Sequence, residues 1–510
     1  MRDKKSGVVY LIGAGPGDPD LITVKGRRYL RAADVVVYDY LANESLLSLA
    51  GRDAEIIYVG KKSGRHTMHQ GDINKLLVKK AQEGLTVVRL KGGDPFIFGR
   101  GGEEAMELSK EGVKFEIISG VTSAIAVPAY AGIPLTHREH SSAVCFITGH
   151  EDPGKEESDI NWDSLAKFSG TLIFLMGIAN LDKIAKKLIN NGRSEKTPVA
   201  IVANGTTPNQ KTIIGTLGNI CERATEENLK PPGIIVVGDV VNLRDSIDWF
   251  ESRPLFGKVV LVTRPEEQAA DFVKRLSDLG ARCILLPAIK ILPPPSWKDL
   301  DKAIKNISGY DWILFTSVNG AKYFFERLYF AGKDVRTLGS VKIGAIGPKT
   351  KEALIERGIS PDLIPDDYLS EGIVESLKGH HIDGKKVLLP RPAIAGKYLP
   401  AKLKEMGAIV DEVEAYRTVK PDDNQKKLDI LLEGEKIDVI TFTSPSTVKN
   451  FMAMFRDRPV FGKISKSIIA CIGPVTEQEA VKEGLKVSIV PDEYTVEGLS
   501  EAIVEFLGKI

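Results

Sequence analysis

Short runs of β-branched residues alternate along the chain with stretches that have the spacing of amphipathic helices. The run Val8–Ile12 predicts a buried strand, as do Thr86–Val88 and the run from Gly257 to Val262. Strands separated by helices favour α/β layering, and α/β is therefore the fold class that we expect.

The pattern changes at two places, which suggests domain boundaries. The larger break falls near residues 245–257, before the strand that starts at Gly257. The first part divides again near His137–Ser142, after which Ala143–Thr148 begins a second, smaller sheet. We therefore expect a first domain over 1–250, with subdomains at about 1–138 and 139–245, and a second domain over 251–510.

The second domain contains an internal duplication. Three of its segments recur 126 or 127 positions further along: Gly257–Pro265 as Gly384–Pro392, Leu314–Ser317 as Thr441–Ser444, and Ala345–Thr350 as Cys471–Thr476. Each copy has the size of a domain and is too long for a solenoid repeat. The constant offset therefore predicts two similar α/β lobes.

The composition is that of an ordinary soluble globular protein, with 43% hydrophobic and 27% charged residues. A length of 510 residues allows two to four domains. A net charge of +1 gives no overall attraction to nucleic acid or membrane, and no apolar run approaches the roughly twenty residues of a membrane span. With no signal peptide and four scattered cysteines that read as buried free thiols, we expect a cytoplasmic protein.

A glycine-rich segment from Arg89 to Glu104 directly follows the strand at Thr86–Val88. Glycine at this density lets backbone N–H groups approach a ligand closely. Asp94 lies in this loop, where a carboxylate has few structural duties, and Glu103 and Glu104 open the next helix. A phosphate cradle would avoid carboxylates, so the expected ligand carries positive charge or hydroxyls. S-adenosylmethionine fits, with its sulfonium, amino group and ribose diol.

A second loop, Gly13–Pro19, follows the strand Val8–Ile12 and at first looks like a dinucleotide fingerprint. That fingerprint needs G-x-G-x-x-G, whereas the third glycine, Gly17, stands one place early. Pro16 and Pro19 also remove N–H donors that would face a pyrophosphate. A nicotinamide-dependent dehydrogenase is the alternative, and protection of Pro16 by NAD but not by S-adenosylmethionine would support it.

Residues 8–245 resemble the uroporphyrinogen-III C-methyltransferases of the tetrapyrrole methylase family. The resemblance rests on long, ordered motifs: Gly13–Pro19, Ala33–Asp39, Gly60–Lys62, Arg89–Glu104, Gly120–Ala124 and Tyr130–Arg138. It implies that uroporphyrinogen III is methylated twice to precorrin-2, with S-adenosylmethionine as donor and S-adenosylhomocysteine as product. It also implies a homodimer formed through this half.

The same resemblance implies roles for individual residues. Asp39 would accept the pyrrole proton during methyl transfer, with Lys61 as the proton-donating partner. The donor site would consist of Pro16, Gly92, Gly93, Asp94, Ile97, Thr122, Ser123, Met176 and Gly205. From the sequence alone, Asp39 could instead cap a turn, Met176 could be a core methionine and Gly205 could belong to a plain turn.

Two groups of basic residues have more than one reading. Arg65 and His66, with His69, could hold substrate carboxylates or form an ordinary polar loop. The group at His137, Arg138 and His140 has the same two readings. Neither histidine pair comes with a third metal ligand at suitable spacing, so we predict no metal site.

Residues 257–508 resemble uroporphyrinogen-III synthase, on weaker motifs. These are Thr316–Ser317 with Asn319–Gly320, Ile346–Pro348, Tyr416–Thr418, Thr443–Ser446 and Tyr494–Thr495. The resemblance implies a two-lobed, segment-exchanged α/β fold in which Leu286–Leu292 and Val413–Val419 are paired crossovers. Lobe one would be 257–290 plus 419–510, and lobe two 293–416. The whole chain would then be a two-subdomain tetrapyrrole methylase fold followed by this synthase fold.

The synthase resemblance implies that hydroxymethylbilane is closed to uroporphyrinogen III with its last pyrrole inverted, and that Tyr416 lies near the leaving hydroxyl. Acidic substrate side chains would suit helix N-termini at four strand-to-helix turns, represented by Thr316, Ser317, Thr350, Thr443, Ser444 and Thr476. Each turn could also be a plain N-cap, and this half could be a non-catalytic tetrapyrrole-binding module. Since no further Rossmann unit is visible, precorrin-2 should be handed on toward siroheme or cobalamin.

Overall fold

The computed structural model describes residues 7–60, 68–150, 159–367, 370–419, 436–455 and 466–508. These residues form two compact units. The first unit runs to Val259 and also takes in Arg275–Arg282 and the chain from Leu507. The second unit comprises Val260–Lys274 and Cys283–Phe506.

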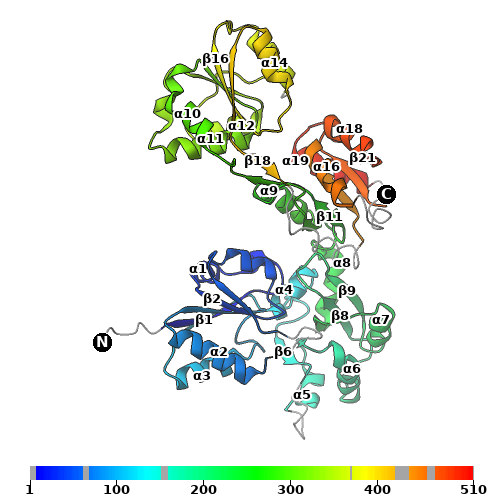
Figure 1. Cartoon of the computed structure of the whole chain (residues 1–510). Coiled ribbons are helices and arrows are strands. Elements are labelled where there is room, and N and C mark those ends of the chain that lie inside the picture. Colours follow the sequence, from blue (N-terminus) through cyan, green and yellow to red (C-terminus); the bar gives the residue numbers. More distant parts are fainter. Residues whose placement is uncertain are drawn as a thin grey trace, which may run out of the picture. The chain divides into compact units, whose positions relative to one another are not determined.

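A five-stranded parallel sheet, in the order β3-β2-β4-β1-β5, forms the core of the first part of the chain. One face packs on α2 (Gln70–Gln82) and α3 (Gly101–Lys110), and the opposite face packs on α1 (Val24–Arg31) (Figure 1). Burial on both faces explains why the inner strands β1 and β2 are continuous apolar runs. Since all strands run parallel, their carboxyl ends share one edge. The strands are β1 (Val8–Gly13), β2 (Val35–Tyr38), β3 (Glu55–Tyr58), β4 (Thr86–Lys91) and β5 (Lys114–Ile118).

A second sheet, in the order β6-β7-β10-β8-β9, begins at Val144. It is mixed, because β6 and β7 are parallel while the other neighbours are antiparallel. One face packs on α6 (Leu181–Asn190) and α7 (Ile220–Glu226), and the other on α4 (Ser123–Tyr130). The prediction of a smaller second sheet is wrong, since both sheets have five strands. The strands are β6 (Val144–Thr148), β7 (Thr171–Leu175), β8 (Pro198–Ala203), β9 (Lys211–Thr216) and β10 (Gly233–Val237).

The second unit contains two larger sheets that share one strand order. Lobe one has the order β12-β11-β19-β20-β21, and lobe two has the matching order β17-β16-β14-β15. The strands of lobe one are β11 (Val259–Val262), β12 (Arg282–Leu285), β19 (Val439–Phe442), β20 (Ile468–Cys471) and β21 (Val487–Ile489). Those of lobe two are β14 (Trp312–Phe315), β15 (Lys342–Ala345), β16 (Lys386–Arg391) and β17 (Ile409–Glu414).

The pairing register shows the duplication directly. In lobe two, Gly344 forms a parallel bridge to Leu363. In lobe one, Ala470 pairs with Ile489, and each of these residues lies 126 positions after its counterpart in lobe two. The predicted pair of similar α/β lobes is therefore confirmed.

Helices cover the sheets of both lobes. Lobe two packs on α10 and α11 through one cluster of apolar side chains and on α13 and α14 through another, while the lobe-one sheet packs on α16 and α18 (Figure 1). The bounds are α10 (Lys298–Lys305), α11 (Val318–Phe330), α13 (Ser370–Leu377), α14 (Tyr398–Glu405), α16 (Pro445–Phe455) and α18 (Pro474–Lys482). Each lobe is therefore a layered α/β body with its own core.

Two short strands connect the lobes. The strand β13 (Lys290–Leu292) pairs antiparallel with β18 (Arg417–Val419), and Ile291 lies opposite Thr418. The predicted pairing of the two crossovers is confirmed for these residues. Val413, placed in the crossover by the sequence, belongs instead to β17 of lobe two.

Two further expectations concern burial. No helix among the described residues is long and apolar enough to cross a membrane. Cys471 is buried, whereas Cys145, Cys221 and Cys283 are half-buried. The prediction of buried thiols is thus correct for Cys471 alone, and burial raises the pKa of that thiol to about 12.

Candidate active site

The first unit holds a pocket of about 730 Å³ that is lined from both of its sheets. This volume lies within the range of small-molecule sites. The structure brings eight residues with a predicted role together in its lining: Pro16, Asp39, Gly92, Gly93, Ile97, Ser123, Met176 and Gly205. Six of them follow strands of the parallel sheet, at the edge where the carboxyl ends of these strands meet.

The two glycine-rich loops contact each other beside this pocket. Gly15 and Gly93 exchange backbone hydrogen bonds with N–O distances of 3.2 and 2.7 Å. Gly93 has a φ of +67°, which L side chains rarely adopt. A Cβ on Gly92 would lie 2.4 Å from the Cβ of Leu41. The glycine density read from the sequence therefore allows close approach of three loops at the pocket wall.

The first loop is also attached to Thr206, which follows β8 of the second sheet, and to Tyr130 at the end of α4. The Asp18 backbone N–H donates to Thr206 Oγ1 at 3.0 Å, and the Tyr130 hydroxyl donates to Asp18 Oδ2 at 2.7 Å. Burial and the Asp18 carboxylate raise the pKa of the Tyr130 phenol. These two hydrogen bonds therefore hold the Gly13–Pro19 loop in place where the two halves of the pocket meet.

Asp39 lies in the pocket as one end of a line of charges. Its Oδ2 accepts from Arg89 Nη2 at 2.8 Å, and its Oδ1 accepts from the Leu41 backbone N–H at 3.2 Å. Arg89 Nε and Lys91 Nζ both donate to Glu104 Oε1, at 3.2 and 2.8 Å. Burial, and then the Arg89 guanidinium, lower the pKa of the Lys91 ammonium. Asp39 thus caps its turn and also lies beside the cavity as a paired carboxylate.

Apolar side chains surround the charged wall of the pocket. Tyr40, Leu41, Ile97, Phe98 and Met176 all line it and are all exposed. Such clustered exposure of large apolar groups is typical of a binding surface. Met176 directly follows β7 and has a left-handed backbone, with φ +57°. It is therefore not the core methionine that its apolar run suggests, and backbone strain of this kind is common at ligand sites.

Asp94 and Thr122 differ from the other predicted donor-site residues, since neither lines the pocket. Asp94 is 9% exposed, and its two carboxylate oxygens accept from the backbone N–H groups of Phe96 at 2.8 Å and Gly120 at 3.0 Å. The expectation that this carboxylate has few structural duties is wrong, because it joins two loops. Thr122 caps α4 by accepting from the Ala124 N–H at 3.3 Å.

Three predicted site residues, Lys61, Arg65 and His66, lie outside the described residues. The other histidine group is described. His137, Glu139 and His140 hold their ligand atoms within 4.8 Å of one another. The expectation that no third ligand accompanies this histidine pair is wrong, because Glu139 supplies one. That the chain binds no metal stays a prediction.

In the second unit, Tyr416 contacts the start of α11. The Tyr416 hydroxyl lies 3.1 Å from Ser317 Oγ, and Ser317 Oγ also accepts from the Gly320 N–H at 3.0 Å. Tyr416 is buried and stacks on Tyr323. Burial raises the pKa of Tyr416, against the effect of the bond to Ser317. The phenol therefore keeps its proton at neutral pH and can act as a donor.

The six predicted carboxylate-binding positions fall into two equivalent sets. Thr316, Ser317 and Thr350 follow β14 and β15 of lobe two, and Thr443, Ser444 and Thr476 follow β19 and β20 of lobe one. In both lobes the second turn is joined to the end of the first strand, by Ile346 N–H to Phe315 O at 3.0 Å and Ile472 N–H to Phe442 O at 2.9 Å. Thr350 and Thr476 are buried. The serines act as caps of the helices that follow them, as the plain reading foresaw.

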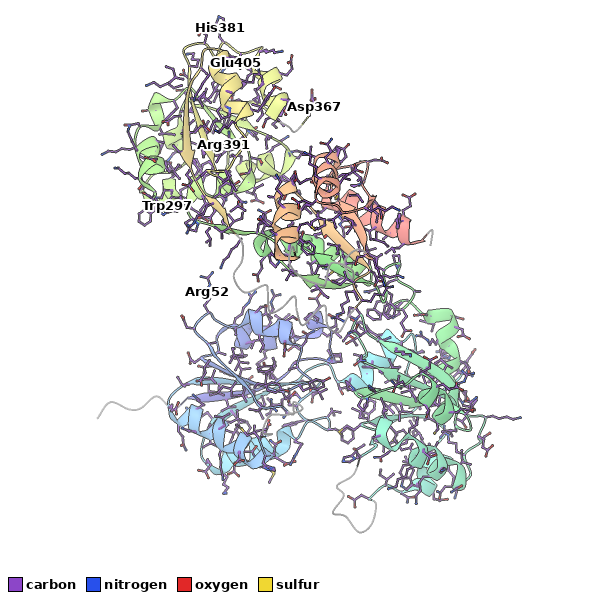
Figure 2. All side chains as sticks on the ribbon, turned by 45° about the vertical axis from the view of Figure 1, so that its right-hand side comes forward. Arg52, Trp297, Asp367, His381, Arg391 and Glu405 are labelled. Atoms are coloured by element: carbon purple, nitrogen blue, oxygen red, sulfur yellow. The ribbon has the colours of Figure 1, made fainter. Side chains whose placement is uncertain are left out.

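Two arginines of the second unit are candidate site residues that were not predicted from the sequence. Arg264 lies two positions after the end of β11 and Arg391 ends β16, and their offset of 127 positions makes their places in the duplication equivalent. Burial lowers the pKa of both guanidinium groups, and Arg391 lies near enough to influence Tyr416. Figure 2 shows Arg391 in the body of lobe two and His381 at its tip. The Arg-Pro pairs at 264–265 and 391–392, which recur at equivalent positions of the duplication, could have indicated these arginines from the sequence.

In the first unit, the side chains of Arg89, Lys91 and Glu104 belong to the site although no role was predicted for them. Arg89 and Lys91 lie two positions apart on an otherwise apolar strand, so they share one face of it. Two cations on one face of a buried strand need a buried anion, and Glu104 in the first turn of α3 supplies it. The spacing of Arg89 and Lys91 could therefore have indicated a buried anion from the sequence.

Fold and site together define a two-part α/β protein, in which a pocketed two-sheet unit is followed by a duplicated two-lobed unit. Residues 8–221 match the family of Tetrapyrrole (Corrin/Porphyrin) Methylases, and residues 270–501 match Uroporphyrinogen-III synthase HemD. The porphyrin biosynthesis protein HemD of Ruminiclostridium josui is 40% identical over 507 residues, covering 98% of each chain. The chain therefore belongs to this family of fused tetrapyrrole methylases and uroporphyrinogen-III synthases, and the predicted fold class is confirmed.

Relatives of the first half alone are also known. The S-adenosyl-L-methionine-dependent uroporphyrinogen III methyltransferase of Methanosarcina barkeri is 56% identical over 239 residues, which cover 47% of this chain and 94% of that protein. A solved structure of uroporphyrin-III C-methyl transferase from Thermus thermophilus, complexed with S-adenyl homocysteine, is 39% identical. It covers 46% of this chain and 100% of that chain, with a TM-score of 0.41.

Proposed function

We propose that this chain is a bifunctional enzyme of tetrapyrrole synthesis. Its second half closes hydroxymethylbilane to uroporphyrinogen III with inversion of the last ring, and its first half methylates that product twice to precorrin-2. The observation that carries the methyl-transfer assignment is Asp39, held by Arg89 in the wall of a pocket that glycine loops and exposed apolar side chains complete.

The pocket suits S-adenosylmethionine as methyl donor. Gly92, Gly93 and Gly205 keep its wall free of side chains, and Ile97 and Met176 supply apolar contacts for an adenosyl group. The donor brings an activated methyl group, and the chain's own residues would orient it toward a pyrrole carbon. Asp94 and Thr122 would contribute by shaping the loops. The relative from Methanosarcina barkeri, whose name specifies this donor, supports the assignment.

Asp39 would accept the pyrrole N–H proton as the ring carbon takes the methyl group. Its Oδ2 is bonded to Arg89 and its Oδ1 to a backbone N–H, so a lone pair remains on each oxygen. Lys61 is proposed as the proton-donating partner, and Arg65 and His66 as contacts for the substrate's carboxylates, from the resemblance alone.

Ring closure would depend on Tyr416 and on the helix N-termini of both lobes. A protonated Tyr416 hydroxyl, oriented by Ser317, would donate to the hydroxyl that leaves the bilane. The carbon–oxygen bond breaks and water is released. The pyrrole stabilises the resulting cation, which forms the closing carbon–carbon bond to the last pyrrole, and the proton that this pyrrole loses restores the Tyr416 phenol. The helix N-termini at Thr316, Ser317, Thr350, Thr443, Ser444 and Thr476 would hold acidic side chains of the substrate through their backbone N–H groups.

Several finer assignments belong to this proposal. The domain limits would be 1–250 and 251–510, with the lobe boundaries given above. The division between the two compact units at Val259 and Val260 supports these domain limits. The protein would work in the cytoplasm on small tetrapyrroles, without nucleic acid or membrane, as a homodimer through its first half. Precorrin-2 would be handed to enzymes of siroheme or cobalamin synthesis.

Two separate assays on the full chain test the proposal. Uroporphyrinogen III with labelled S-adenosylmethionine should gain two methyl groups by mass spectrometry. Hydroxymethylbilane without a methyl donor should give isomer III, identified after oxidation to porphyrins. Isomer I alone in the second assay, with methylation intact in the first, would instead favour a non-catalytic tetrapyrrole-binding second half.

A further inference from the structure

Glu104 lies behind the pocket wall and has no exposed surface. Its Oε1 accepts three hydrogen bonds, from Lys91 Nζ at 2.8 Å, Gln70 Nε2 at 3.1 Å and Arg89 Nε at 3.2 Å. Its Oε2 has no hydrogen-bond partner among the residues that the structure describes. All the bonding of this buried carboxylate is therefore concentrated on one oxygen.

Such an arrangement is a poor way to stabilise a fold. Arg89 and Lys91 are also buried, and taking charges out of water costs more than a well-packed apolar group of the same volume would. Leaving one buried carboxylate oxygen without a donor adds to that cost. Buried charge networks of this kind, when they border a pocket, are candidates for a role in function.

The order of the charges indicates what that role is. Lys91, Glu104, Arg89 and Asp39 alternate in sign, and Asp39, at 26% side-chain exposure, is the most exposed of the four. The Arg89 guanidinium is held on one side by Glu104 at Nε and donates from Nη1 to the Leu90 carbonyl at 3.0 Å. Its Nη2 is then directed to Asp39. Glu104 itself does not line the pocket, so any effect on chemistry passes through Arg89.

We propose that Glu104 is a positioning residue for methyl transfer, which fixes the Arg89 guanidinium and through it the orientation of the Asp39 carboxylate. The inference rests on the proposed function of this pocket. Lys91 shares the carboxylate as a second cation and balances its charge.

The test substitutes Glu104→Gln, which keeps the shape and removes the charge. We expect kcat for methylation of uroporphyrinogen III to fall between about tenfold and a hundredfold, the scale of one charge-assisted hydrogen bond. The KM for S-adenosylmethionine should stay within about twofold, because Glu104 does not touch the donor pocket. Rates are expressed per binding-competent site, counted by calorimetry with S-adenosylhomocysteine, so that loss of folded protein is not read as loss of kcat.

Two controls separate positioning from mere structure. Glu107→Gln makes the same charge change one turn further along α3, where Glu107 lies in a loose surface pair with Lys110, and should leave kcat unchanged. Lys91→Met leaves Glu104 on Arg89, so it should reduce kcat less than Glu104→Gln does. An equal loss of kcat in Lys91→Met would overturn the proposal, because the charge of Lys91, and not the anchoring of Arg89 by Glu104, would then explain the effect.

A double-mutant cycle with Asp39→Asn gives the decisive result. If Glu104 acts through Asp39, Glu104→Gln should cause little further loss of kcat once Asp39 is replaced. Additive losses, or an unchanged kcat in Glu104→Gln, contradict the inference. A wild-type chain that transfers no methyl group would instead refute the proposed function, so the two failures are distinguishable.

Discussion

Arg89 Nη2 donates to Asp39 Oδ2 across 2.8 Å, and this pair joins a buried strand to the open pocket. The two residues lie fifty positions apart in sequence. Arg89 is on β4, and Asp39 directly follows the neighbouring strand β2, in which Val37 is opposite Arg89. The register of the parallel sheet therefore places the Arg89 guanidinium beside the Asp39 carboxylate. This contact and the place of Asp39 in the cavity support the proposal that Asp39 accepts the pyrrole proton.

Asp39→Asn should slow methyl transfer by roughly 10²-fold or more, because the amide cannot accept the pyrrole proton. The Asn side chain can still accept from the Leu41 N–H, so the turn should persist. Donor affinity, measured by calorimetry with S-adenosylhomocysteine, should stay the same. Loss of donor affinity in this variant would show that Asp39 shapes the pocket instead.

Asp94→Ala should lower thermal stability and donor affinity together. The substitution removes two part-buried hydrogen bonds to a carboxylate, from the N–H groups of Phe96 and Gly120, each contributing about 1.5–3 kcal/mol. Thermal unfolding and calorimetry on the same preparation measure both effects. Lost affinity with an unchanged unfolding temperature would mean that Asp94 contacts the donor directly.

Gly205→Ala should narrow the pocket wall. The new Cβ would lie 2.4 Å from Cγ1 of Val127, which also lines the pocket, so one of the two must shift. We expect donor affinity to fall several-fold and to recover in part when Val127→Ala is added. If the second change brings no recovery, the loss arises from something other than this contact.

Tyr416→Phe should slow ring closure without unfolding lobe two, because the ring that stacks on Tyr323 is retained and only the hydroxyl is lost. Spontaneous closure to isomer I should then take a larger share of the product. The isomer ratio after oxidation to porphyrins, separated chromatographically, measures this. Wild-type turnover together with a wild-type ratio would leave Tyr416 as a packed aromatic.

Much of this architecture could be predicted because it is written in local patterns. The glycine-rich loops predicted close backbone contacts, which Gly15 and Gly93 make. The constant offset between the repeated segments predicted the two lobes. The paired crossovers followed from the same duplication together with the family resemblance.

The remainder depended on direction and pairing, which a linear pattern does not contain. Nothing in the loop sequence showed that the Asp94 carboxylate turns toward backbone N–H groups and not toward the pocket. The left-handed backbone of Met176 contradicts the preference of its residue type. The burial of Glu104 results from contacts with residues on β4 and α2, and only the two cations on β4 hinted at it.

The measurement that tests the account most directly combines both activities in one reaction. The pure full-length chain is incubated anaerobically with hydroxymethylbilane and labelled S-adenosylmethionine, and the tetrapyrrole product is identified by mass spectrometry and by isomer analysis. We expect a doubly methylated product on the isomer III skeleton, precorrin-2. Unmethylated isomer I as the sole product would contradict it.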